Sequence, residues 1–323
     1  MKCKRVMAVL IASVLSCLSC SVANATEDYG NSVVASSDNP HGGTLMKNAV
    51  TGEVTYLTDD FSDNGLFDDV EVDSIDNDGG ISTQDIIGSD DRQKITYPYN
   101  SSQFRSTVYI ETHTADGGIY RGSGFMIGPN AVATAGHIVF AHGHGGDGWI
   151  TYAKVTPALC SAVSGSGYYG YAEAIAYQCG ANYANGESAD DDWGIIILDR
   201  NIGNQTGWLD IASLSLSSYN NLSVKLNGYP VEVRGEYQED LFMSTGTISS
   251  ATSRTLTSYN IDCTGATSGG PCYYATNGQY KIIGICRGGS DENDDSVTTR
   301  YTDFLRIDNW LYNKLTSFRN STL

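Results

Sequence analysis

A loop of small residues surrounds Ser268, where residues 264–271 have the sequence Thr-Gly-Ala-Thr-Ser-Gly-Gly-Pro. A serine hydroxyl is a weak nucleophile, so an enzyme that uses one presents it on a tight turn, with backbone N–H groups facing the oxyanion and a base within reach. Ser-Gly-Gly runs are also common in plain turns. The loop therefore indicates a nucleophile only if a base and an orienting acid accompany it.

A histidine and an aspartate in suitable contexts precede the serine. His137 ends two strand-like apolar runs at residues 122–135, and Asp192 opens directly into the apolar run at residues 193–198. The order His, Asp, Ser is the chymotrypsin-type order and differs from the hydrolase-fold and subtilisin orders. We therefore predict His137 as the general base, Asp192 as the group that orients it, and Ser268 as the nucleophile of an acyl-transfer reaction.

These motifs resemble those of the glutamyl endopeptidases of bacilli and the V8-like proteases, the bacterial branch of the chymotrypsin-like serine proteases. The matching stretches are residues 87–92, 126–129, 132–137, 192–194, 227–230, 299–301 and the serine loop. The resemblance covers the chain from about Asp85 to its C-terminus. It implies an all-β fold of two six-stranded antiparallel β-barrels with a C-terminal helix, and a secreted serine endopeptidase that acts on proteins or peptides.

The resemblance also assigns the residues around the nucleophile. Asp190 and Asp191 compete with Asp192, but the family aspartate directly precedes an aromatic-Gly-aliphatic strand, so we expect the other two to be a solvated run. The oxyanion hole is expected at the N–H groups of Ser268 and Ala266. The family has glycine at the position of Ala266, so a positive φ there costs alanine about 1 kcal/mol or more.

Two cysteines replace the residues with which the glutamyl enzymes bind a substrate carboxylate. The family's threonine, five residues before the serine, is Cys263, and its histidine on the following strand is Cys286. We hypothesise that the two form a disulfide in the specificity pocket, which offers no donor to a carboxylate. Arg287 and Arg300 are candidate cations for substrate binding, although an exposed loop charge and a structural ion pair explain them equally well.

The first 25 residues are typical of an export signal. Lys2, Lys4 and Arg5 precede an apolar core at residues 6–18 and a small-residue cleavage site at residues 23–25. A membrane anchor is less favoured because the apolar run is shorter than the roughly 20 residues that span a bilayer. A lipoprotein box at residues 14–17 ranks second. We therefore expect a secreted, extracellular protein.

Residues 26–84 are rich in Asp, Asn, Gly and Ser, and Lys47 is the only lysine or arginine between residues 27 and 78. Such a segment is expected to bury little and not to fold alone. An extended, solvated tail is one interpretation. We favour a propeptide, because the segment lies between a signal and the start of the resemblance, which places the protease domain at residues 85–323.

Five of the eight cysteines remain after the expected signal is removed, and an oxidising compartment favours disulfides. Cys160 and Cys179 bracket a Gly/Ser/Tyr-rich loop and are expected to pair with each other. With Cys263 and Cys286 joined in the pocket, Cys272 would then be a free, buried thiol.

Composition narrows the possible partners. The chain has 323 residues and a formal net charge of −18, which argues against nucleic acid or an anionic membrane as a partner.

Short alternating runs predict many strands, and helical spacing predicts one helix at residues 303–315. We expect a monomer that needs no metal or organic cofactor. The acids at residues 291–295 fit a solvated loop better than a calcium site, and His142 and His144 fit a flexible loop better than a metal site.

A second class of function stays open at this point: a secreted binding or adhesion protein on a protease scaffold, with an oxyanion hole spoiled by Ala266. The presence of all three triad residues argues against it.

Overall fold

The computed structural model describes residues 21–23, 42–58, 84–163, 167–233, 235–237, 239–294 and 297–320. The expected export signal, except for Ser21–Ala23, lies outside these residues, as does most of the expected propeptide. The side chains of the acids at residues 291–295 also lie outside the described part of the structure. Within the described part of the chain, no helix is long and apolar enough to cross a membrane.

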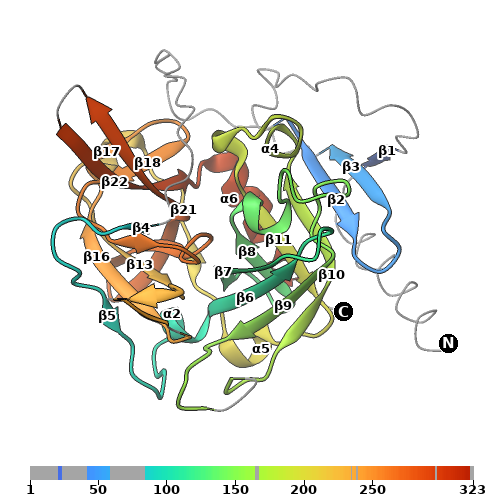
Figure 1. Ribbon diagram of the computed structural model, residues 1–323, viewed down its shortest axis with the longest axis horizontal. Helices are drawn as coiled ribbons and strands as arrows, with labels where there is room; N and C mark the ends of the chain where they lie inside the picture. The colour runs from blue at the N-terminus through green and yellow to red at the C-terminus, as the bar shows by residue number, and fades with distance from the viewer. Residues whose placement is uncertain are drawn as a thin grey trace.

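The first half of the domain is a closed antiparallel barrel of six strands (Figure 1). Its order is β9-β6-β7-β8-β11-β10, and β10 pairs with β9 to close it. Val108 and Ile110 of β6 are fully buried, and Thr107 and Tyr109 are 0% and 7% exposed, so both faces of the strand are buried over residues 107–110. The strands are β6 (Thr107–His113), β7 (Ile119–Met126), β8 (Ala131–Thr134), β9 (Tyr152–Pro157), β10 (Ala172–Gly180) and β11 (Gly194–Leu198).

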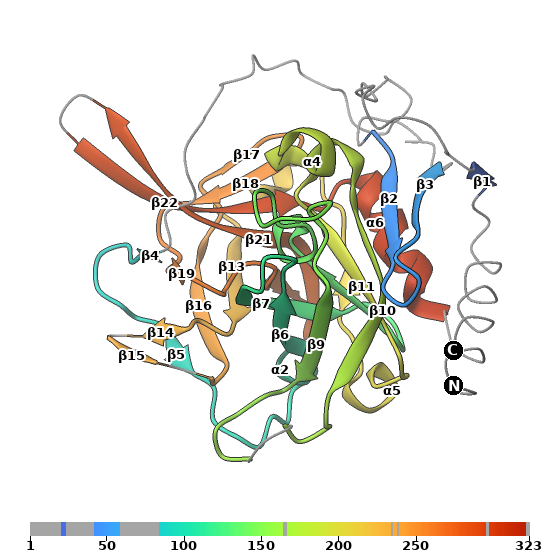
Figure 2. The same ribbon diagram turned by 45° about the vertical axis from the view of Figure 1, so that its right-hand side comes forward.

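The second half is a larger sheet of order β17-β18-β22-β21-β20-β13-β16-β5, with β12 beside β21. Among the described residues no pairing closes this sheet into a barrel. Its strands are β5 (Gln93–Lys94), β12 (Asp210–Ile211), β13 (Ser223–Gly228), β16 (Phe242–Thr247), β17 (Ser250–Ala251), β18 (Thr255–Ser258), β20 (Pro271–Thr276), β21 (Gln279–Asp294) and β22 (Val297–Arg306). The long β21–β22 hairpin projects from the body of the molecule (Figure 2).

Short elements connect these sheets. Two small pairings join β14 (Glu232–Val233) to β15 (Glu236–Tyr237) and β19 (Cys263–Thr264) to β4 (Gln84–Asp85). The helices are α2 (Ser102–Arg105), α3 (Gly136–Val139), α4 (Ala181–Gly186), α5 (Gly203–Thr206) and α6 (Asn309–Thr316), with 3₁₀ turns η1 (Ala189–Asp191), η2 (Leu216–Tyr219) and η3 (Ser317–Asn320).

The C-terminal helix begins later than the sequence predicts. Residues 303–306 belong to β22, and α6 begins at Asn309. Asp308 is the helix N-cap, since its side chain accepts the N–H of Leu311 at 2.8 Å. Phe304 is buried in the core of the second sheet, so its spacing to Ile307 reflects strand packing and not a helix face.

Part of the expected propeptide is folded onto the first barrel, so the expectation that residues 26–84 bury little is wrong for that part. β2 (Thr44–Asn48) and β3 (Val54–Thr58) form a hairpin, and β2 pairs with β10. β3 also pairs with β1 (Ser21–Ala23). Leu45 and Leu57 are 6% and 1% exposed. A long-range partner therefore supplies the burial that the local composition does not predict.

Candidate active site

Two neighbouring strands of the barrel bring His137 and Asp192 together. β8 leads into α3, which carries His137, and β11 follows directly after Asp192 and Trp193. Gly194 pairs with Thr134 across these strands. Asp192 then accepts two hydrogen bonds from one residue: its Oδ2 lies 2.9 Å from His137 Nδ1, and its Oδ1 accepts the His137 backbone N–H at 2.8 Å. The carboxylate thus fixes both the position and the orientation of the ring.

The close approach of these segments favours a glycine before the histidine. A Cβ on Gly136 would lie 3.0 Å from Asp192 Oδ1 and 3.2 Å from the backbone nitrogen of Trp193. On the far side of the turn, Trp193 is fully buried, and its ring lies 5.6 Å from that of Trp310 in α6. The C-terminal helix therefore packs against the residue next to Asp192.

The other two acids of the run differ from each other. Asp190 is exposed, as expected of a solvated run. Asp191 is only 1% exposed, so the expectation that it is solvated is wrong. Its carbonyl accepts the N–H of Trp193 at 2.8 Å, because η1 turns the chain back on itself just before Asp192.

The loop that carries Ser268 is hydrogen-bonded to the first barrel through Ser123 of β7, a residue to which the sequence assigned no role. The N–H of Ser123 donates to the carbonyl of Ser268 at 2.8 Å. Its Oγ donates to the carbonyl of Ala266 at 2.7 Å and accepts the N–H of Tyr229 at 2.8 Å. Ser123 is fully buried, so one side chain joins the two halves of the domain at the serine loop.

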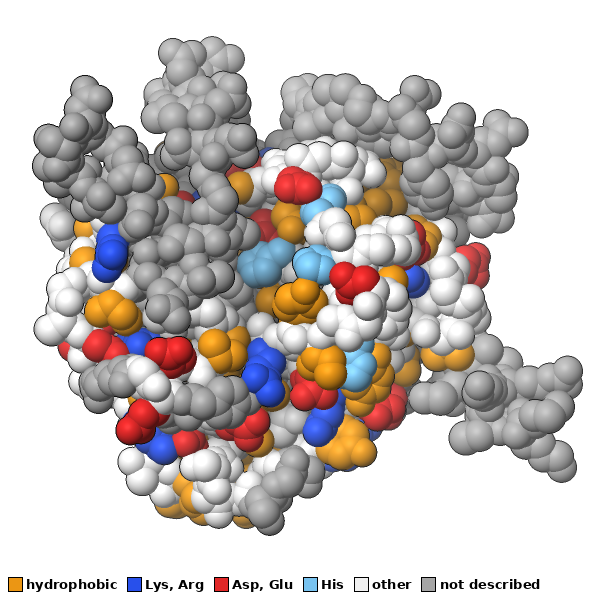
Figure 3. Space-filling model, viewed as in Figure 1, with side chains coloured by type: hydrophobic (Ala, Val, Ile, Leu, Met, Phe, Trp, Pro, Cys, Tyr) orange, Lys and Arg blue, Asp and Glu red, His pale blue; other side chains and the backbone are white. Residues whose placement is uncertain are grey.

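Ser268 and His137 line the same cavity, of about 380 Å³. In this structure the hydroxyl of Ser268 donates to the backbone carbonyl of Arg287 at 3.0 Å and not to the imidazole. Seen from the face of Figure 1, the histidine side chains gather near the centre of the molecule (Figure 3). His142 and His144 also line the cavity, together with Tyr183 and Glu187.

These two extra histidines have partners of their own. His142 Nε2 lies 3.0 Å from the carbonyl of Tyr183, and His144 Nδ1 lies 3.1 Å from Asp116 Oδ2. Among the described residues, no group of three or more His, Cys, Asp or Glu side chains is placed to hold a metal ion. Their clustering with aromatic residues gives the cavity a polar, titratable rim that the sequence alone did not reveal.

Ala266 has the left-handed backbone conformation that the sequence raised as a cost, with φ of 68°. No described residue accepts a hydrogen bond from the N–H of Ala266 or from the N–H of Ser268. Alanine therefore adopts the conformation for which the family uses glycine, at a cost of about 1 kcal/mol or more.

The two cysteines at the family's carboxylate-binding positions lie in contact, although only Cys263 lines the cavity. Cys263 Sγ is 3.4 Å from Cys286 Sγ, and both are buried, unbonded thiols. A hydrogen bond from Cys263, burial and nearby charges raise the pKa of Cys286. Cys263 also lines the cavity with Ser268.

The expected pairing of Cys160 with Cys179 is wrong. Both are free and buried, and they belong to different apolar clusters. The antiparallel register between β9 and β10, in which Val155 is opposite Ala172, carries the two cysteines away from each other.

Neither candidate arginine lines the cavity. Arg287 donates to Asp303 Oδ2 at 3.3 Å, Thr255 Oγ1 at 3.1 Å and the carbonyl of Ala189 at 2.8 Å. Ala189 begins the turn that precedes Asp192, so Arg287 connects the second sheet to that turn. Arg300 donates to the carbonyl of Ile86 at 3.2 Å.

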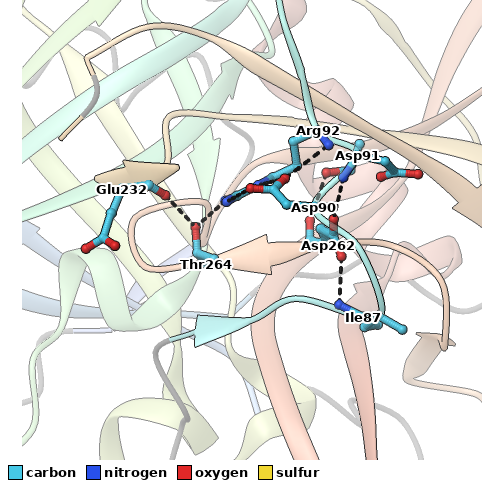
Figure 4. A network of polar contacts seen from close by, with 8 residues as sticks. Ile87, Asp90, Asp91, Arg92, Glu232, Asp262 and Thr264 are labelled. Atoms are coloured by element: carbon cyan, nitrogen blue, oxygen red, sulfur yellow. Dashed lines mark hydrogen bonds and ion pairs between the residues drawn. The ribbon is translucent and has the colours of Figure 1, made fainter. Parts of the chain in front are cut away.

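A polar network attaches residues 87–92 to the cavity wall (Figure 4). Asp262 Oδ1 accepts the N–H of Ile87 at 2.8 Å, and the buried Arg92 donates to Thr264 Oγ1 at 2.6 Å. Arg92 is also paired with Asp90 at 2.9 Å. Because Thr264 lines the cavity two residues before Ala266, this network supports the strand that leads to the serine loop.

Opposing effects set the pKa of His137. Burial of the ring has the largest effect and lowers the pKa, but the charge and hydrogen bond of Asp192 together outweigh it. The pKa of His137 therefore lies above its ordinary value of 6.5. The positive charge of Arg287 has a smaller effect, which lowers the pKa of His137.

A closed antiparallel barrel with a His–Asp pair, beside a second sheet with a serine loop, defines the class of the chymotrypsin-like serine endopeptidases. Residues 88–311 match the family described as Trypsin. The chain belongs to this family of serine proteases and is a serine endopeptidase of its V8-like branch.

Two bacterial proteins are similar to this chain over most of its length. The chain is 31% identical over 234 residues to "Extracellular metalloprotease" of Bacillus subtilis, covering 70% of this chain and 69% of that protein. It is 29% identical over 245 residues to "Glutamyl endopeptidase" of Bacillus licheniformis, covering 74% and 71%.

Solved structures share the fold. A Glu endopeptidase in complex with MPD matches with a TM-score of 0.55 at 19% identity, over 72% of this chain and 98% of that one. Protease Anisep from Arthrobacter nicotinovorans matches with a TM-score of 0.53 at 17% identity, over 70% and 99%.

Replacing Ser123 should destabilise the junction between the two halves. In Ser123→Ala the buried carbonyl of Ala266 and the N–H of Tyr229 lose their partner, so the free energy of unfolding should fall by about 1–3 kcal/mol. Denaturant unfolding measures this change. Ser250→Ala, at an exposed serine of β17, is the control. Equal stabilities of the two variants would show that the side chain of Ser123 does not stabilise the junction.

Two substitutions should move the pKa of His137 in opposite directions. Asp192→Asn keeps an oxygen acceptor but removes the charge, so the pKa should fall. Arg287→Met removes a positive charge, so the pKa should rise, and the acid limb of the kcat/KM profile should move to higher pH. NMR titration of the imidazole checks both. Arg300→Met should leave the pKa unchanged, and a matching shift in that control would contradict the effect assigned to Arg287.

Proposed function

We propose that the chain is a secreted serine endopeptidase that forms an acyl-enzyme on Ser268, with His137 as general base and Asp192 as the group that orients it. The observation that carries this proposal is the two-point hydrogen bonding of His137 by Asp192 beside a serine in the same cavity.

The first half of the reaction follows from this arrangement. Ser268 Oγ leaves the carbonyl of Arg287, attacks the scissile carbonyl carbon and transfers its proton to His137 Nε2. The Asp192 carboxylate stabilises the imidazolium. The N–H groups of Ala266 and Ser268 are the donors for the oxyanion. His137 then gives the proton to the leaving amine as the peptide C–N bond breaks.

Hydrolysis of the acyl-enzyme repeats the same steps with water. His137 takes a proton from the water that attacks the ester carbon and returns it to Ser268 Oγ. Because the base must be neutral, activity should decline as the pH falls through the pKa of His137, which lies above 6.5. These steps involve the substrate, one water molecule, and the side chains and N–H groups named above.

The substrate pocket of this proposal differs from that of the glutamyl enzymes. Cys263 and Cys286 take the positions of the family's carboxylate-binding threonine and histidine, and their sulfur atoms lie in contact. Neither Arg287 nor Arg300 lines the cavity; Arg121 of β7 does, but it does not take the position of either member of the family's pair. We infer an apolar pocket that prefers apolar or small side chains, and a disulfide between the two sulfur atoms in an oxidising compartment.

Secretion and maturation complete the proposal. The basic, apolar and small-residue regions at residues 1–25 support export, as does the similarity to an extracellular protein of Bacillus subtilis. The start of the family match at residue 88 supports cleavage near Asp85.

Covalent labelling separates this function from that of a binding protein on a protease scaffold. We expect an organophosphate probe to label Ser268 of the purified protein, because labelling requires an activated serine. Mass spectrometry locates the adduct, and Ser268→Ala and His137→Ala should abolish it. An unlabelled wild-type protein that is folded would favour the binding-protein alternative.

Cleavage of a mixed peptide library tests the pocket. We expect cuts after apolar or small residues, which Ser268→Ala abolishes. Cys263→Thr combined with Cys286→His restores the family's carboxylate-binding pair and should raise the kcat/KM for Glu relative to Ala by about tenfold or more. Cys272→Ala, at a buried thiol that does not line the cavity, is the control. Cleavage by the wild-type protein mainly after Glu would contradict an apolar pocket, and non-reducing peptide mapping shows whether the disulfide forms.

A further inference from the structure

The barrel leaves part of one strand edge without a partner from within the barrel. β10 pairs with β11 from Ala174 to Cys179, but on its other edge β9 pairs only at Ala172 and Glu173. Beyond that point β10 pairs with β2 of the N-terminal hairpin, through residues 176–180. An uncovered edge presents free N–H and C=O groups that promote pairing with other chains. The hairpin therefore completes the hydrogen bonding of this strand.

The hairpin is also packed into the barrel core. Leu45, Met46 and Leu57 are 6%, 5% and 1% exposed. Leu45 belongs to the same apolar cluster as Trp193 and the residues of β11. Removing the hairpin would expose these side chains and leave a gap against the core, which is a cost of the kind measured for large-to-small core substitutions.

Backbone and side-chain contacts hold both ends of the hairpin. The N–H of Ala49 donates to the carbonyl of Ile175 at 2.9 Å, and the N–H of Ala181 donates to the carbonyl of Gly43 at 3.1 Å. Lys47, the only cation between residues 27 and 78, lies 3.1 Å from Asp147. The hairpin lies beside β10 in both ribbon views, and none of its residues lines the cavity (Figures 1 and 2).

The strand that the hairpin covers leads directly to the site. β10 continues into α4 and η1, which ends next to Asp192. Tyr183 of α4 and Glu187 just after it line the cavity. The hairpin therefore supports the start of the segment that positions Asp192.

We propose that residues 42–58 are a retained strand-addition partner of the protease domain: they stay bound to β10 in the active enzyme after the chain is cut between residues 58 and 85. The inference rests on the proposed cleavage near Asp85. Residues 42–58 would then have a permanent structural role without covering the cavity.

A nicking experiment on the full chain tests the proposal. A recognition sequence for a site-specific protease is inserted between residues 59 and 83, and the purified chain is cut and passed over a sizing column under native conditions. Denaturing mass spectrometry of the domain peak shows whether the peptide with residues 42–58 is still present. Leu45→Asp places a charge in the core, and Val50→Asp places one at the exposed turn of the same hairpin.

We expect the peptide to co-elute with the domain for the wild-type sequence and for Val50→Asp. Leu45→Asp should release it, lower the Tm by roughly 5 °C or more and slow the labelling of Ser268 several-fold. Loss of the peptide from the wild-type domain would overturn the proposal, whether or not Leu45→Asp folds. A chain that keeps the peptide but is not labelled would overturn the proposed function alone.

Discussion

The site depends on the two hydrogen bonds that Asp192 accepts from His137. A single contact to Nδ1 would leave the imidazole free to swing about the contact, whereas the second bond, from the backbone N–H, fixes the start of α3 as well. The surrounding structure maintains this geometry. The pairing of β8 with β11 sets the spacing of the segments that carry His137 and Asp192, and the small size of Gly136 lets these segments approach. Trp193, next to Asp192, packs against Trp310 of the C-terminal helix.

The serine comes from the other half of the chain, so its position depends on contacts across the junction. Ser123 supplies three of these contacts from a single buried position, and Arg287 adds another through the turn before Asp192. The two sheets share an apolar cluster, and these contacts add polar atoms to their interface. Such contacts are directional, so they specify one relative arrangement of the sheets, which apolar packing alone does not.

Much of this arrangement could be predicted from the sequence. The order of His137, Asp192 and Ser268, each beside an apolar run, predicted the contact of His137 with Asp192 and a cavity shared by His137 and Ser268, because strand ends and tight turns have local signatures. The fold class followed from the resemblance that these motifs carry. The failures share a different cause. The start of the last helix, the separation of Cys160 from Cys179, the burial of Asp191 and the packing of residues 42–58 all depend on partners that are distant in the sequence. The contacts of Ser123 have no local signature either, since a serine between two glycines is compatible with any tight strand.

The pairing of β2 with β10 also has a consequence for synthesis of the chain. Translation delivers the hairpin long before β10, so during elongation β2 and β3 have no edge to bind and their leucines stay in water. Local pairing is fast, but a two-stranded hairpin is marginally stable by itself. The acidic composition of residues 26–84 opposes association of the segment with other copies during this interval, because like charges repel. The last segment to dock would then be one of the first to be made, and its docking would mark the completion of the first barrel.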